Sequence, residues 1–116
     1  MESILNTIKK MLGIEADYEA FDVDLIVNIN MVFNVLNQLG VGPAAGFRIT
    51  SSVETWSDFL GDEAKLEMVK TYIYLRVKKV FDPNQNSGIT QAFDAEIKEL
   101  EWRLNVQVDP GESSDG

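Results

Sequence analysis

The chain has 116 residues, with 19 Asp and Glu against 10 Lys and Arg, a net charge of −9, and neither histidine nor cysteine. Its length and its 45% content of hydrophobic residues fit one globular domain with one modest core. The missing residue types exclude zinc fingers, disulfide frameworks and histidine-activated nucleophiles, and the acidic excess argues against a protein that binds nucleic acid by neutralising phosphates.

The first predicted element is a short amphipathic helix over residues 3–12. Its apolar residues recur at helical spacing, Ser3 is a suitable N-cap, and Gly13 is a suitable stop. An acidic linker follows, and we expect its last residue, Asp22, to be the N-cap of the next helix.

The second predicted helix spans residues 23–39 and ends before Gly40. Its main apolar stripe is Leu25, Ile29, Val32, Leu36 and Leu39. A second apolar row, Val27, Met31 and Val35, falls outside that stripe, although a surface helix needs only one. Two interpretations stay open: the helix is nearly enclosed in its own core, or it carries a second contact surface.

Residues 40–54 are rich in glycine and form the weakest region for regular structure. The alternation of Phe47 and Ile49 with polar neighbours is compatible with one short strand, which would need a pairing partner. A capping box, at residues 51–54 or at residues 55–58, then predicts a short helix carrying Trp56.

Two longer helices complete the prediction, over residues 63–81 with Asp62 as N-cap, and over residues 90–106. The first has a main stripe of Leu66, Val69, Ile73, Val77 and Val80 and a second row of Met68, Tyr72 and Leu75. The last has a narrow stripe with Trp102 pointing away from it. We therefore predict an all-α single domain of four to five helices over residues 1–108, with a short loop or strand excursion around 40–54 and a polar, flexible tail over 109–116.

No pattern of catalytic, cofactor-binding or metal-binding residues stands out, so we expect neither an enzyme nor a cofactor. Asp17, Glu19, Asp22 and Asp24 cluster in the linker without the glycine and closing glutamate of an EF-hand. The basic residues near Lys78 and Lys79 fit the last turns of a helix better than a nucleic-acid site. No apolar run is long enough for a membrane span, and the N-terminal lysines are not followed by the apolar stretch of a signal peptide.

Apolar residues outside the core stripes are the more informative signal. A monomer of this size rarely leaves several such rows exposed, so they indicate protein–protein contacts unless other parts of the chain cover them. The candidate interface residues are Val27, Met31, Val35, Phe47, Ile49, Met68, Tyr72, Leu75 and Trp102.

Three stretches together resemble the small head–tail connector, or adaptor, proteins of tailed bacteriophages. They are DVDLIVNIN at residues 22–30, VKTYIYLRVKKVFDP at residues 69–83, and EIKELEWRLNV at residues 96–106. Trp56 and the FLG of residues 59–61 fit the same layout, and the resemblance covers most of residues 20–108.

The resemblance implies a structural virion protein at the neck, made in the cytoplasm of the bacterial host. Such proteins form a ring, typically of twelve copies, that docks on the portal, extends the DNA channel and receives the stopper or tail. DNA passes through without specific recognition, and no catalytic residues carry over. The resemblance makes residues 90–116 the candidate portal contact and residues 40–54 the candidate contact with neighbouring subunits or the stopper.

Two other classes of protein stay open. A small acidic helical regulatory or protein-binding module without catalytic activity would share the composition, but it would remain a monomer or dimer. An enzyme working through carboxylates alone would bind a divalent cation at Asp17, Asp22 and Asp24.

Overall fold

Five α-helices make up the regular structure. The computed structural model describes residues 2–60, 65–81 and 87–108. Its helices are α1 (Ile4–Met11), α2 (Asp22–Gln38), α3 (Trp56–Phe59), α4 (Leu66–Phe81) and α5 (Ser87–Val108). The all-α prediction is confirmed, whereas the predicted cap Asp62 and the predicted tail 109–116 lie outside the described residues.

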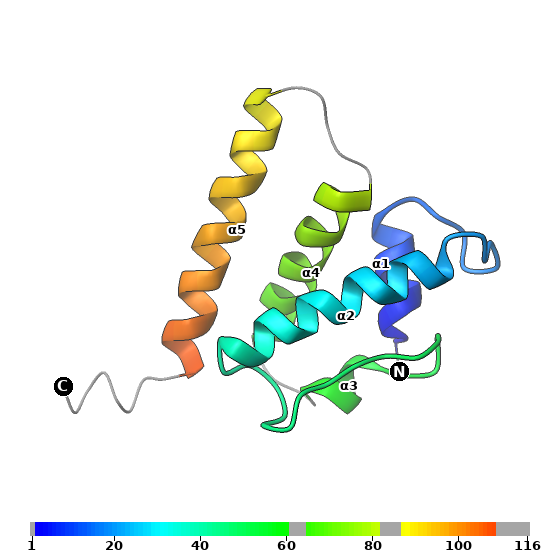
Figure 1. Cartoon of the computed structure of the whole chain (residues 1–116), viewed down its shortest axis with the longest axis horizontal. Helices are drawn as coiled ribbons and strands as arrows, with labels where there is room; N and C mark the ends of the chain where they lie inside the picture. Colours follow the sequence, from blue (N-terminus) through cyan, green and yellow to red (C-terminus); the bar gives the residue numbers. More distant parts are fainter. Residues whose placement is uncertain (1, 61–64, 82–86, 109–116) are drawn as a thin grey trace.

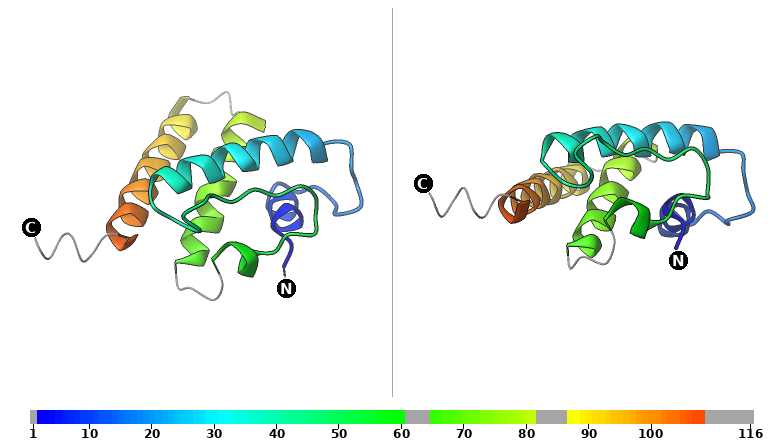
Figure 2. Two further views of the ribbon diagram at one scale, coloured as in Figure 1. Left: turned by 60° about the horizontal axis from the view of Figure 1, so that its bottom comes forward. Right: turned by 90° about the horizontal axis from the view of Figure 1, so that it is seen from below.

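The helices form a flat arrangement with extents of 49, 36 and 20 Å. α4 occupies the centre, with α5 packed along one side and α1 on the other (Figure 1). α2 crosses α4 as a separate layer, which is clearest when the molecule is seen from below (Figure 2). The connection before α2, residues 13–21, and helix α5 therefore lie at opposite ends of the molecule (Figure 1).

Local capping signals set the ends of the short helices as predicted. The Ser3 hydroxyl accepts a hydrogen bond from the Asn6 N–H at the start of α1. The Thr55 and Asp58 side chains each accept from the other residue's backbone N–H and form the capping box of α3. Gly13, with φ of 82°, takes the left-handed conformation that commonly ends a helix.

The predicted cap of α2 is wrong. Phe21 is the N-cap, without a side-chain hydrogen bond, and Asp22 is the first helical residue. The Asp22 carboxylate forms an ion pair with Lys9 of α1 instead of capping its own helix. A tertiary contact has here displaced a local one.

The core forms where the main stripes of the helices meet. The α2 residues Leu25, Ile29, Val32 and Leu36 are buried, and so are the α5 residues Ile97, Leu100 and Leu104. In α4 the stripe prediction fails at Val80, which is 64% exposed and borders an open hollow between α2, α4 and α5. α5 starts at Ser87, three residues earlier than predicted. It packs on a different side of α4 from α2.

The predicted strand at residues 47–50 is absent. Among the described residues the structure has no strand, only an isolated bridge between Ser3 and Thr55. The segment runs extended beside α2, and the Asn30 amide takes the place of a strand partner. Its Oδ1 accepts from the Ile49 N–H at 2.7 Å, and its Nδ2 donates to the Ile49 carbonyl at 2.9 Å.

Candidate docking surface

The nine predicted interface residues divide by burial into three groups. Val27, Met31 and Trp102 are exposed; Val35, Phe47 and Met68 are half-buried; Ile49, Tyr72 and Leu75 are buried. The buried three are covered within the single chain and cannot present an apolar surface to a partner. For them the core interpretation holds, and the interface expectation is corrected.

Tyr72 is buried because α5 packs over it. Its hydroxyl donates to Glu101 Oε2 at 2.7 Å and accepts from Arg76 at 3.1 Å, while Arg76 also pairs with Glu101 at 3.2 Å. Burial, followed by the hydrogen bond to the Glu101 carboxylate, raises the pKa of Tyr72 to about 12. This polar cluster joins α4 to α5 and is structural.

Ile49 and Phe47 belong to the packing beneath α2. Ile49 is fully buried, and its backbone is held by Asn30. Phe47 packs edge-on against Phe33 with ring centroids 5.1 Å apart, and both rings contact Phe59. Gly42 passes so close to this cluster that a Cβ there would lie 2.4 Å from a Phe59 ring carbon.

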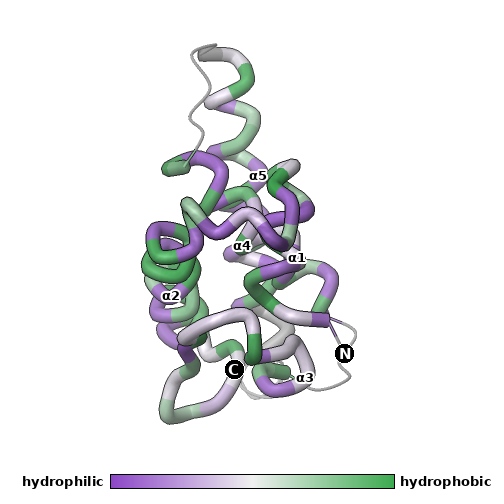
Figure 3. Tube along the Cα trace, turned by 90° about the vertical axis from the view of Figure 1, so that its right-hand side faces the viewer, coloured by the Kyte–Doolittle hydropathy of each residue, from purple (hydrophilic) through white to green (hydrophobic). Residues whose placement is uncertain are grey.

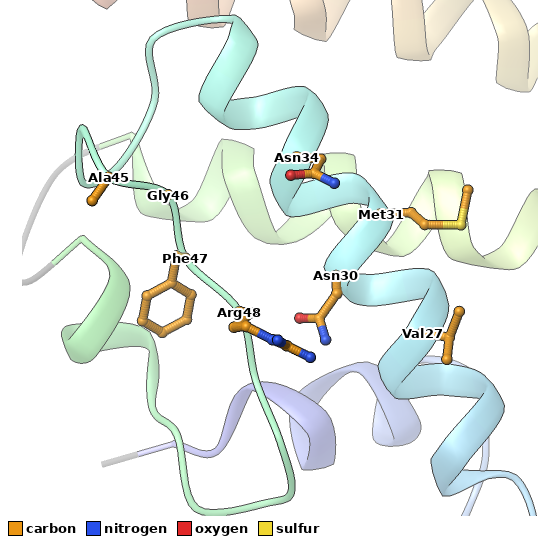
Figure 4. A pocket seen from close by; sticks show the side chains of 8 residues that line it. All are labelled: Val27, Asn30, Met31, Asn34, Ala45, Gly46, Phe47 and Arg48. Atoms are coloured by element: carbon orange, nitrogen blue, oxygen red, sulfur yellow. The ribbon is translucent and has the colours of Figure 1, made fainter.

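A groove runs between α2 and residues 45–48, and we call it the α2 groove (Figure 4). Its lining residues are Val27, Asn30, Met31, Asn34, Ala45, Gly46, Phe47 and Arg48. Asn30 points from the helix toward the extended segment, with Arg48 beside it, and Val27 and Met31 project from the helix. Val27 is 54% exposed and Met31 61%, so the groove carries two off-core apolar side chains on one side of Asn30 and the Arg48 cation on the other (Figure 4).

Met31 also borders a second hollow between α2, α4 and α5, which contains Val80 and Ile97. The cations at its rim are already engaged, because Arg76 pairs with Glu101 and Lys79 with Asp94. Hydrophobic residues thus lie on more than one side of α2, as the hydropathy colouring also shows (Figure 3). The sequence interpretation of a second contact surface therefore fits Val27 and Met31.

The loop at residues 13–21 is held by a residue that the sequence analysis did not single out. Lys9 is fully buried, and its ammonium donates to the carbonyls of Ala16, at 2.9 Å, and Tyr18, at 2.7 Å. It also lies 2.8 Å from Asp22 Oδ1 as an ion pair. In the sequence, only the position of this lysine on the apolar face of a helix could have indicated its burial. Its partners are backbone carbonyl groups, which every residue type has, so the sequence does not mark them.

The carboxylates near this loop do not form a metal site in the described part of the chain. Asp22 is engaged by Lys9, and no group of three acidic side chains among the described residues could hold a metal ion. In the same residues, no helix has the length and apolar character needed to span a membrane.

Trp102 lies on the outer side of α5. It is 67% exposed, whereas Ile97, Leu100 and Leu104 on the opposite side of the helix are buried. α5 is at one end of the molecule and the loop at residues 13–21 at the other (Figure 1). The chain therefore presents exposed apolar side chains on separate faces.

Comparison with protein families accounts for a chain whose exposed apolar side chains lie on separate faces. The family model described as phage connector protein matches residues 4–111, nearly the whole chain. The chain belongs to the phage connector protein family. The family is structural, so this connector protein is a structural component of the phage particle. No curated protein and no solved structure matched the chain.

Proposed function

We propose that this connector protein forms a ring at the phage neck, docks on the portal, extends the DNA channel and receives the stopper or tail. The ring has about twelve copies, as the resemblance to head–tail adaptors implies. The observation that carries the proposal is the pair of exposed apolar surfaces on different sides of the molecule, Val27 and Met31 on α2 and Trp102 on α5. The α2 surface is the proposed contact between neighbouring subunits, which must be heterologous to repeat around a circle, and the α5 surface is left for a second partner.

The charge of the chain suits a DNA conduit. Twelve copies carrying −9 each give a total on the order of −100, and a negative channel wall repels DNA rather than binding it. DNA then passes through the ring without specific recognition, and the connector needs no catalytic residue or cofactor.

The outer face of α5 around Trp102 is the proposed portal contact. A tryptophan exposed at the end of the molecule is the kind of residue that dominates the binding energy of an interface. Trp102→Ala should weaken recovery of the connector on purified portal rings at least tenfold. Far-UV circular dichroism should show unchanged helix content, because the indole lies outside the core.

Light scattering of the isolated connector, with and without portal rings, tests the ring itself. A particle of about twelve subunits, alone or on the portal, is the expected result. A connector that remains a monomer or dimer at every concentration and does not bind the portal would contradict the proposal and favour the small regulatory module.

A further inference from the structure

The α2 groove carries an uncompensated cation. Arg48 is exposed and forms no ion pair with any described residue, although the chain is strongly acidic. Asn34, also exposed in the groove, has no hydrogen-bond partner in the described part of the chain. With Val27 and Met31 beside them, these groups fit an occupant that brings a large apolar side chain flanked by carboxylates.

The loop before α2 has the complementary chemistry. Glu15, Asp17 and Glu19 are exposed, and none of them pairs with a cation among the described residues. Between them Tyr18 is 51% exposed, with its ring packed against Phe21 at a centroid distance of 5.6 Å.

The loop is also preorganised for contact. Lys9 holds the carbonyl groups of Ala16 and Tyr18, so the backbone around the exposed side chains is fixed before any partner arrives. Binding by such a loop loses little conformational entropy, which favours affinity.

The two surfaces are separate parts of one subunit. The loop ends where α2 begins at Asp22, and the groove is lined by α2 residues from Val27 to Asn34, roughly 8 to 18 Å further along the helix at 1.5 Å per residue. The loop is held in place by Lys9, and none of its residues lines the groove of its own chain. A loop from a second copy can occupy the groove while the first copy's loop remains available to a third.

We infer that the acidic loop at residues 15–19 of one copy docks in the α2 groove of the next. Tyr18 packs on Val27 and Met31, and the loop carboxylates face Arg48. The inference rests on the proposed ring and names the contact between neighbouring subunits. The contact is heterologous, and repetition around an axis closes a ring.

Charge reversal on each side of the contact tests the pairing. Arg48→Glu makes the groove acidic, and the double change Asp17→Lys with Glu19→Lys makes the loop basic. Each variant alone should raise the concentration for half-maximal association, measured by sedimentation, at least tenfold. An equimolar mixture should associate again, because each variant's groove then meets the other's oppositely charged loop. Trp102→Ala, on the outer face of α5, is the control and should associate like the wild type.

Cross-linking distinguishes the geometry, since the chain has no cysteine of its own. Ala45→Cys places a thiol at the edge of the groove, and Glu19→Cys places one on the loop. With a short bismaleimide, the double variant should give a ladder of dimers, trimers and larger species on a denaturing gel. Each single variant should give essentially none, because only one thiol lies at each contact.

The outcomes separate this inference from the proposed ring. If the wild type forms rings but the charge variants associate normally, or no ladder appears, the groove is not the subunit contact and its occupant is another neck protein. Dimers from the single variants would show a two-fold contact and overturn the inference. A wild type that is monomeric at every concentration, both alone and in the presence of portal rings, would overturn the ring and the contact together.

Discussion

The irregular segments and the α4–α5 pair are held together in different ways. In residues 13–21 and in residues 45–50, backbone groups are held by a polar side chain from a neighbouring helix, Lys9 in the first case and Asn30 in the second. α4 and α5 pack through apolar stripes over many residues, and a polar cluster around Tyr72 adds to them.

This difference determines how much of the structure a single substitution destabilises. A backbone without regular hydrogen bonds needs each buried polar group satisfied individually, so the loss of one side chain releases a whole segment. A helix pair has its backbone satisfied internally and shares its packing over several turns. Single substitutions that act on the irregular parts of the chain should therefore lower the free energy of unfolding more than one that acts on the α4–α5 pair. Four variants test this, from the largest effect to the smallest.

Lys9→Met should have the largest effect. It leaves two carbonyl groups and the Asp22 carboxylate without their cation, and we expect a loss of about 3–5 kcal/mol in the free energy of unfolding. Urea denaturation measures the loss. Lys10→Met is the matched control, because the neighbouring lysine is exposed and should change stability by less than about 0.5 kcal/mol. Equal losses in both variants would contradict the role of Lys9.

Gly42→Ala should cost about 2–4 kcal/mol. Gly42 has φ of 92°, and the added Cβ would lie 2.4 Å from a Phe59 ring carbon that is packed against Phe33 and Phe47. Gly13→Ala separates the two causes, since Gly13 has φ of 82° but nothing within 4 Å of its Cβ position. It should lose only the backbone part, about 1–2 kcal/mol. A thermal melt in which Gly13→Ala is the less stable variant would exclude the proposed clash.

Asn30→Ala should cost about 1–3 kcal/mol, because the Ile49 N–H and carbonyl lose their partners in a buried setting. Hydrogen exchange at the Ile49 amide should accelerate more than exchange in α4. Asn34→Ala, one turn along the same helix, is the control and should leave both measurements near the wild-type values. Unchanged Ile49 exchange in Asn30→Ala would mean that other contacts hold the segment.

Tyr72→Phe should have the smallest effect, about 1 kcal/mol near neutral pH, because the apolar packing of the ring remains. The pKa of Tyr72 is about 12 in the folded chain, against about 10 for an unfolded tyrosine. Its stabilising contribution is complete below pH about 10 and is lost as the pH rises to about 12. Urea denaturation between pH about 10 and pH about 12 should show a fall in the free energy of unfolding of the wild type that is missing in Tyr72→Phe. Parallel pH profiles would contradict the assignment.

Elements with local signals were predictable from the sequence. Ser3 caps α1 and the Thr55 and Asp58 pair caps α3, because the donor and the acceptor lie within a few residues of each other. The angle of Val27 and Met31 around α2 placed them outside the main stripe, but it left open whether another part of the chain covers them.

Features that depend on distant partners were not predictable. The burial of Tyr72 depends on where α5 lies, and the exposure of Val80 depends on the hollow that α2, α4 and α5 leave between them. The hydrogen bonds between Asn30 and Ile49 join residues nineteen positions apart. Lys9 donates to backbone carbonyl groups, which every residue type has. Helical periodicity ranks the faces of a helix, but it contains no information about which neighbour covers them.

The attachment of α1 to residues 54–56 has a consequence for synthesis of the chain. The Ile4 N–H donates to the Glu54 carbonyl, the Trp56 N–H to the Glu2 carbonyl, and the Trp56 indole to the Thr7 hydroxyl. These contacts of α1 therefore cannot form until residue 56 has been synthesised. Until then the contacts that join α1 to residues 54–56 are missing in the nascent chain, and forming them closes a long loop at a cost in conformational entropy. Truncated chains ending before Trp56 should accordingly be recognised by chaperones more strongly than chains that extend past it.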